Sequence, residues 1–253
     1  MKTKTLKKFL GAIAVVAIML TGLVIFLLCV KEKKWASEME EESNRLGIDA
    51  VAPEGETVTK SKLSRPELCS LLLILASVAL WYIGYNAVTS KYSLYASSVL
   101  GMDYNTTLLL AQAAAIVSYL PAGMVASKIG RKKTILAGVV MLASAFAVAS
   151  FMRIGSSPIL MNVLFALAGI GWATINVNSF PMVVEMCSGA DIGKYTGYYY
   201  TASMAAQIVT PMFSGYLMDQ MGMTVLFPYA AIFVALAFVT MALTRHGDAK
   251  TAA

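Results

Sequence analysis

The chain of 253 residues is 58% hydrophobic and only 13% charged, whereas soluble domains carry about 25% charged residues. Its net charge of +6 does not indicate nucleic-acid binding, because the Lys and Arg residues lie at the ends of long apolar blocks, where they orient membrane helices. The blocks are continuously apolar and show no alternation of polar and apolar residues, which favours helices over a membrane barrel. The composition therefore predicts an all-α, multi-pass protein of the cell membrane, with the lipid bilayer as its surroundings.

Seven apolar runs predict seven transmembrane helices, since about 20 apolar residues span the hydrocarbon core. The first run follows a basic start and is not followed by a small-residue cleavage site, so we expect it to be retained. In chain order the runs are Phe9–Val30, Leu68–Ser90 with a helical continuation toward Leu100, Thr106–Ala126, Thr134–Phe151, Pro158–Met186, Lys194–Met218 and Val225–Thr244.

One long connection separates the first helix from the other six. Residues 31–67 hold basic residues at both ends and an acidic cluster at Glu38–Glu42, a composition typical of a solvated linker. The predicted organisation is a transmembrane helix over 1–30, a charged cytoplasmic linker over 31–67, six helices over 68–244 and a cytoplasmic tail over 245–253.

Charge at the helix ends predicts the orientation of the chain. If the linker is cytoplasmic, so are Lys128–Lys133, Cys187–Lys194 and the C-terminus, and these segments together hold 14 of the 20 Lys and Arg residues. Lys91 and Arg153 would then lie outside. The four lysines before Phe9 are in conflict with this arrangement.

Catalytic and metal sites have no support in the sequence. The three cysteines (Cys29, Cys69 and Cys187) are isolated, and His246 is the only histidine. Neither a CxxC pair, an HExxH motif nor a GxSxG motif is present, so we expect no metal, no cofactor and no enzyme activity.

A motif between the third and fourth runs is the most informative stretch. Its sequence, GMVASKIGRKK, has a glycine that permits close helix approach, a second glycine suited to a reversal at positive φ, and three cations that can bond helix C-terminal carbonyls or carboxylates. It resembles the signature loop of the major facilitator superfamily, with serine at the position of the family's usual aspartate. The residues of this signature loop are Gly123, Ser127, Gly130, Arg131, Lys132 and Lys133.

The resemblance implies a fold and a function. One helix, a linker and six helices correspond to helices six to twelve of the family, so the last six form one six-helix half. The stretches Gly169–Pro181 and Gly193–Gly215 resemble the tenth and eleventh helices of sugar–cation symporters of the sucrose and glycoside–pentoside type. The resemblance thus implies secondary active transport of a small polar solute, such as a sugar or glycoside, by alternating access.

Polar and aromatic side chains inside the apolar runs are the candidate solute-binding residues, because such groups are costly against lipid. Aromatic rings and neutral amides suit a polyhydroxylated solute, although amides can also only join helices to one another. Tyr198–Tyr200 are interpreted mainly as aromatics of the membrane interface. The candidates are Tyr82, Tyr85, Asn86, Gln112, Trp172, Asn176, Asn178 and Gln207.

The spans contain no central Asp or Glu, and we expect Glu185 and Asp219, at span ends, to pair with basic residues. A coupling cation, proton or sodium, would need a carboxylate elsewhere, so we expect a separate N-terminal half or a second copy as partner. Two further hypotheses remain: a complete seven-helix protein acting as a homodimeric carrier or channel, and a regulatory membrane protein that does not transport.

Overall fold

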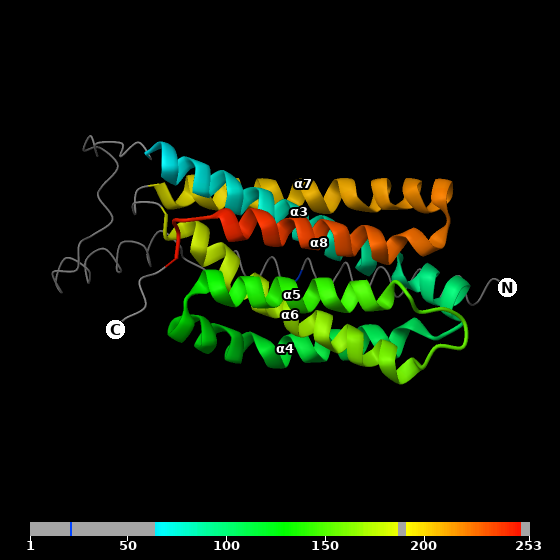
Figure 1. Cartoon of the computed structure of the whole chain (residues 1–253). Coiled ribbons are helices and arrows are strands. Elements are labelled where there is room, and N and C mark those ends of the chain that lie inside the picture. Colours follow the sequence, from blue (N-terminus) through cyan, green and yellow to red (C-terminus); the bar gives the residue numbers. More distant parts are fainter. Residues whose placement is uncertain (1–20, 22–63, 187–190, 249–253) are drawn as a thin grey trace. The chain divides into compact units, whose positions relative to one another are not determined.

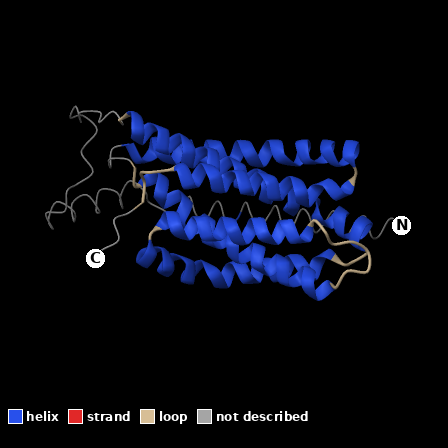
Figure 2. Ribbon diagram, viewed as in Figure 1, coloured by secondary structure: helices blue, strands red, loops and turns tan. Residues whose placement is uncertain are grey.

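The computed structural model describes residues 21, 64–186 and 191–248. Its helices belong to residues 60–253, one of the two units into which the chain divides. The predicted span Phe9–Val30, the linker as far as residue 63 and the tail beyond residue 248 lie outside the described residues. Within them the chain is helical and contains no strand (Figure 2).

Six long helices follow one another with short connections. They are α3 (Arg65–Tyr95), extended by the π-helical turn η1 (Ala96–Leu100), α4 (Tyr104–Ile129), α5 (Arg131–Ala149), α6 (Pro158–Val184), α7 (Ile192–Met221) and, after the short 3₁₀ turn η3 (Met223–Val225), α8 (Leu226–Leu243). Each predicted run between residues 68 and 244 corresponds to one of these helices, and three runs extend past the helix ends, to Phe151, Met186 and Thr244.

Local sequence explains where the helices begin. At the start of α3 the Ser64 N–H donates to the Glu67 carboxylate at 2.8 Å, and the Glu67 N–H donates back to the Ser64 hydroxyl at 3.4 Å. This capping box satisfies two of the backbone donors that every helix start leaves free. Pro158 opens α6, where its missing N–H costs nothing.

The helices form two groups of three, α3 with α7 and α8, and α6 with α4 and α5 (Figure 1). The groups meet mainly where α5 packs against α8. The first three helices pair with the last three in a symmetric way: α3 packs against α7 and α8 as α6 packs against α4 and α5. Such a relation between two runs of three helices is expected for a transporter half built from internal repeats.

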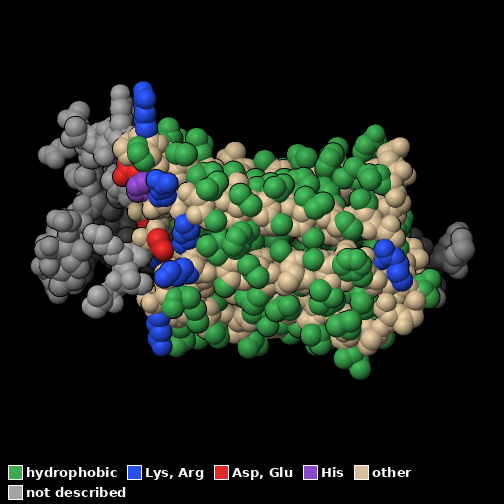
Figure 3. Space-filling model, viewed as in Figure 1, with side chains coloured by type: hydrophobic (Ala, Val, Ile, Leu, Met, Phe, Trp, Pro, Cys, Tyr) green, Lys and Arg blue, Asp and Glu red, His purple; other side chains and the backbone are tan. Residues whose placement is uncertain are grey.

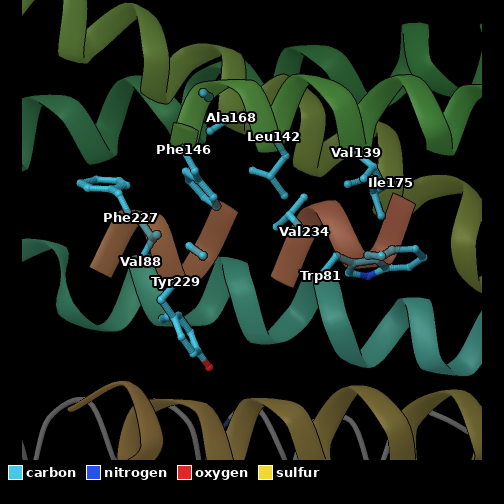
Figure 4. Close-up of a cluster of buried hydrophobic side chains, with 14 of the residues drawn as sticks. Trp81, Val88, Val139, Leu142, Phe146, Ala168, Ile175, Phe227, Tyr229 and Val234 are labelled. Atoms are coloured by element: carbon cyan, nitrogen blue, oxygen red, sulfur yellow. The ribbon is translucent and has the colours of Figure 1, made fainter. Parts of the chain in front are cut away.

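The centre of this unit is an apolar core between α3, α5 and α8 (Figure 4). Trp81, Phe227 and Val234 are completely buried, and Phe146 is 2% exposed. Their rings and branched chains fill the space where the two groups of helices meet.

Close helix approach depends on glycines other than the predicted one. A Cβ at Gly138 of α5 would lie 2.8 Å from the Gly171 carbonyl oxygen of α6, and a Cβ at Gly169 would collide with the Ala111 carbonyl oxygen of α4. Gly123, predicted to permit such an approach, faces open space instead. The missing side chains let α6 lie directly against both α4 and α5.

The segment Lys128–Lys133 was predicted as a loop and is instead almost entirely helical. Helix α4 ends at Ile129 and α5 begins at Arg131, so Gly130 alone connects them. Its φ of +94° lies in the left-handed region that glycine adopts without a steric cost.

Five of the described helices are long and apolar enough to cross a membrane. The exception is α7, which was predicted as a span over Lys194–Met218. It has 30 residues, or about 45 Å at the usual rise, but its tyrosines and polar residues lower its hydropathy. It packs mainly against α3 (Figure 1).

Charged side chains gather at the two ends of the described helices, and the surface between them is mostly apolar (Figure 3). We call the ends the Arg131 end and the Arg153 end after one residue at each. This distribution is expected of helices that cross a bilayer.

Candidate solute-binding site

Two aromatic rings from α3 and α6 form the centre of the candidate site. The rings of Tyr85 and Trp172 are parallel, with an angle of 3° and centroids 3.7 Å apart. Tyr82, one turn earlier on α3, meets Trp172 edge-on at 5.1 Å. The edge-on contact has the geometry that aromatic pairs favour.

A hydrogen bond joins the same two helices beside the rings. The Tyr82 hydroxyl donates to the Asn176 Oδ1 at 3.1 Å, and the Asn176 Nδ2 donates to the Trp172 carbonyl at 3.3 Å. Trp172 and Asn176 are four residues apart and therefore share one face of α6. The structure thus brings together four of the predicted residues.

Helix α7 adds a residue that the prediction assigned to the membrane interface. The Tyr199 hydroxyl and the Ser179 hydroxyl of α6 are hydrogen-bonded at 2.9 Å, and Tyr199 is 4% exposed. Phe180 packs edge-on against the Tyr199 ring, with centroids 5.3 Å apart. A cluster of three consecutive tyrosines within a polar span was the signal that could have indicated this role.

We refer to Tyr82, Tyr85, Trp172, Asn176 and Tyr199 as the aromatic cluster. It draws on the three helices α3, α6 and α7, which no spacing rule within one helix could predict.

Four predicted residues form no hydrogen bond or ring contact with a side chain of the aromatic cluster. Asn178 is 1% exposed, and its Nδ2 donates at 2.9 Å to the Thr174 carbonyl, on the face of α6 that packs against α5 at Gly138. Asn86 and Gln207 donate to carbonyls of their own helices, and Gln112 is exposed on α4.

The aromatic cluster carries no Asp, Glu, Lys or Arg. Among the described spans Lys91 is the cation farthest from a helix end, and it lies against Gly215 of α7, where an added Cβ would be 3.1 Å from its Nζ. Polar atoms in the aromatic cluster are hydroxyls, an amide and an indole N–H, which donate and accept hydrogen bonds without charge.

The signature loop forms a network at the Arg131 end. Arg131 pairs with Glu185 at 2.5 Å, and the Lys132 Nζ donates to the Ala242 carbonyl at 2.9 Å. Ser127 bonds only the Met124 carbonyl of its own helix, and Lys133 is exposed. Asp219, which was expected to pair like Glu185, is exposed and forms no ion pair with another described residue.

Two hollows of the described unit lie away from the aromatic cluster. One, of about 520 Å³, is lined by residues of α5 and α8, and the other, of about 250 Å³, is lined by residues of α4, α5 and α6. Both are lined almost wholly by apolar side chains, so they offer few hydrogen-bonding groups to a polar solute.

Comparison with protein families gives a match to the Major Facilitator Superfamily over residues 104–252, which is more than half of the chain. The chain belongs to the major facilitator superfamily. It is therefore a multi-pass membrane protein, and its family and named relatives are transporters rather than enzymes.

The curated relatives are much longer than this chain. It is 27% identical over 150 residues to the MFS-type transporter ppzB of Metarhizium rileyi (strain RCEF 4871), which is 59% of this chain and 30% of the relative. For the protein of the same name from Metarhizium majus (strain ARSEF 297) the values are 28% over 134 residues, 53% of this chain and 29% of the relative. The matched segment thus spans about a third of the length of these relatives.

Solved structures share the fold at low identity. Tetrameric PepTSo2 matches with a TM-score of 0.59 and 21% identity, over 70% of this chain and 40% of that chain. A bacterial homologue of the human drug peptide transporters PepT1 and PepT2 matches with a TM-score of 0.59 and 20% identity, over 70% of this chain and 42% of that chain. The human organic anion transporter MFSD10 matches with a TM-score of 0.55 and 15% identity, over 73% of this chain and 49% of that chain. The sugar–cation symporter subtype of the sequence analysis finds no support among these neighbours.

Proposed function

We propose that the chain is the C-terminal half of a secondary active transporter of the cell membrane that moves a small, neutral, polyhydroxylated solute by alternating access. The single observation that carries the proposal is the uncharged aromatic cluster between α3 and α6. Parallel rings can stack against the C–H face of a sugar or glycoside, and the hydroxyls and amide can bond its hydroxyl groups. Binding near the middle of the spans is typical of such transporters.

A second candidate is an anionic or peptide solute, because two of the solved neighbours are described as a peptide transporter homologue and an organic anion transporter. A carboxylate would need a cation to replace its lost hydration. The aromatic cluster has none, which favours the neutral solute.

The proposed partner is a second six-helix half, either a separate N-terminal half or a second copy of this chain. The matched segment makes up less than a third of each relative, and alternating access requires two halves that move around a shared site. The described spans have no carboxylate in their interiors, so a coupling proton or sodium ion would bind on that partner.

Intrinsic fluorescence of the full chain in lipid nanodiscs tests the solute class. The chain has three tryptophans, of which Trp172 belongs to the aromatic cluster. Neutral mono- and disaccharides should change the emission saturably, the Trp172→Phe variant should lose the change, and the Trp35→Phe variant should keep it. A saturable response to peptides or organic anions, with none to neutral sugars, would favour the second candidate.

A further inference from the structure

The segment that follows α8 stays on the bundle. Residues Thr244–Asp248, here called the C-terminal strap, cross the helix ends at the Arg131 end. The His246 Nδ1 and the Ser70 hydroxyl of α3 are hydrogen-bonded at 2.9 Å, and the Arg245 N–H donates to the same hydroxyl at 3.4 Å. Two successive residues of the strap therefore bind one side chain of α3.

The strap next contacts the end of α6. Gly247 has a φ of +93°, and a Cβ there would lie 3.1 Å from the Met182 carbonyl and 3.1 Å from the Met186 side chain. Another residue would meet both backbone strain and this contact. The strap can take this path because its fourth residue is glycine.

Asp248 then caps the start of α5. Its Oδ1 accepts hydrogen bonds from the Arg131 N–H at 2.7 Å and from the Lys132 N–H at 3.2 Å. Gly130, at the N-cap position, has no side chain to do this, and a Cβ there would be 2.9 Å from the Asp248 Oδ2. A carboxylate bound to the first N–H groups of a helix is stabilised by the helix dipole.

The start of α5 also holds the end of α8. The Lys132 Nζ donates to the Thr244 carbonyl at 2.5 Å and to the Ala242 carbonyl, while Arg131 pairs with Glu185 at the end of α6. Lys132 thus ties α5 to the end of α8, and Arg131 ties α5 to the end of α6. The result is a closed ring through α8, the strap, α5 and α6.

We propose that the C-terminal strap is a latch for the Arg131 end, in which Asp248 is a positioning residue that orients Arg131 toward Glu185. Asp248 lies 117 residues after Arg131 in the sequence, and its carboxylate binds next to the connection between α4 and α5. Ser127, close to the same connection, donates its hydroxyl to the Met124 carbonyl of its own helix. Loss of the Asp248 acceptor releases the connection between α4 and α5 and leaves the core of Figure 4 intact. The inference is independent of the solute.

Hydrogen exchange of the full chain in nanodiscs tests the latch. In Asp248→Ala, which removes the acceptor oxygens, the amides of residues 130–135 should exchange roughly five- to tenfold faster, as expected for the loss of a helix cap. Asp248→Asn, whose side-chain oxygen can still accept both hydrogen bonds, should keep most of the protection, and the matched control Asp219→Ala, at an exposed aspartate without an ion pair to another described residue, should change nothing there. Equal protection in Asp248→Ala and the native chain would overturn the proposal.

A double-mutant cycle separates positioning from general stability. Glu185→Gln should lower the thermal midpoint of the native chain, and should lower it much less in the Asp248→Ala background, because Arg131 would already be released. If Glu185→Gln has the same effect in both backgrounds, Asp248 does not position Arg131 and the proposal is wrong. Both substitutions lie outside the apolar core, so folding of the core should be preserved.

Discussion

The two asparagines of α6 are chemically identical but face different neighbours. The Asn176 Oδ1 accepts a hydrogen bond from the Tyr82 hydroxyl. The Asn178 Nδ2 instead donates a hydrogen bond to the Thr174 carbonyl, on the face of α6 that packs against α5. We expect Asn176→Ala to weaken solute binding about tenfold, since a lost hydrogen bond in a buried site costs about 1–2 kcal/mol. Asn178→Ala should lower the thermal midpoint and leave the affinity unchanged. Equilibrium binding to both variants is the measurement, and equal losses of affinity would contradict the assignment.

The sequence could predict part of this site. Tyr82, Tyr85, Trp172 and Asn176 stand out because aromatic and amide side chains interrupt apolar runs at spacings of three and four. It could not predict which asparagine faces the site, because the rotation of α6 depends on its contact with Gly138 of α5. The contribution of α7 likewise required the tertiary structure.

Helix packing is decided at the glycines of α6. We expect Gly169→Ala to lower the thermal midpoint by several degrees, because the added methyl group would collide with the α4 backbone, which cannot move aside as a side chain can. Gly123→Ala, in open space on α4, should be neutral or slightly stabilising, since alanine favours a helix over glycine by up to about 1 kcal/mol. Thermal denaturation in detergent compares the two, and a destabilised Gly123→Ala variant would be the contrary result.

The elements themselves follow from hydropathy, with two informative exceptions. The polar stretch around Lys128–Lys133 suggested a loop, but one glycine at positive φ is enough to reverse the chain between α4 and α5. The tail after Thr244 was predicted as a cytoplasmic end, yet Asp248 binds the first N–H groups of α5. Local sequence patterns do not indicate this contact. Both differences come from contacts between residues far apart in the sequence.

Charge asymmetry predicts the orientation of the whole molecule. The Arg131 end holds most of the described Lys and Arg residues and should face the cytoplasm. Exposed Cys69 at the start of α3 should react with a membrane-impermeant maleimide only from the cytoplasmic side, after Cys29→Ser and Cys187→Ser. A Ser157→Cys, Cys69→Ser variant, labelled at the Arg153 end, should react only from outside. Labelling of both sites from one side would refute this topology.

The central claim is that this chain is one half of a transporter, with the solute bound at its aromatic cluster. Its most direct test measures a radiolabelled neutral sugar twice with the full chain, as equilibrium binding in nanodiscs and as uptake into liposomes that hold at most one chain each. We predict saturable binding that Asn176→Ala weakens, and no saturable uptake, because one half cannot alternate access alone. Saturable uptake by single chains, or binding that Asn176→Ala does not affect, would contradict the account.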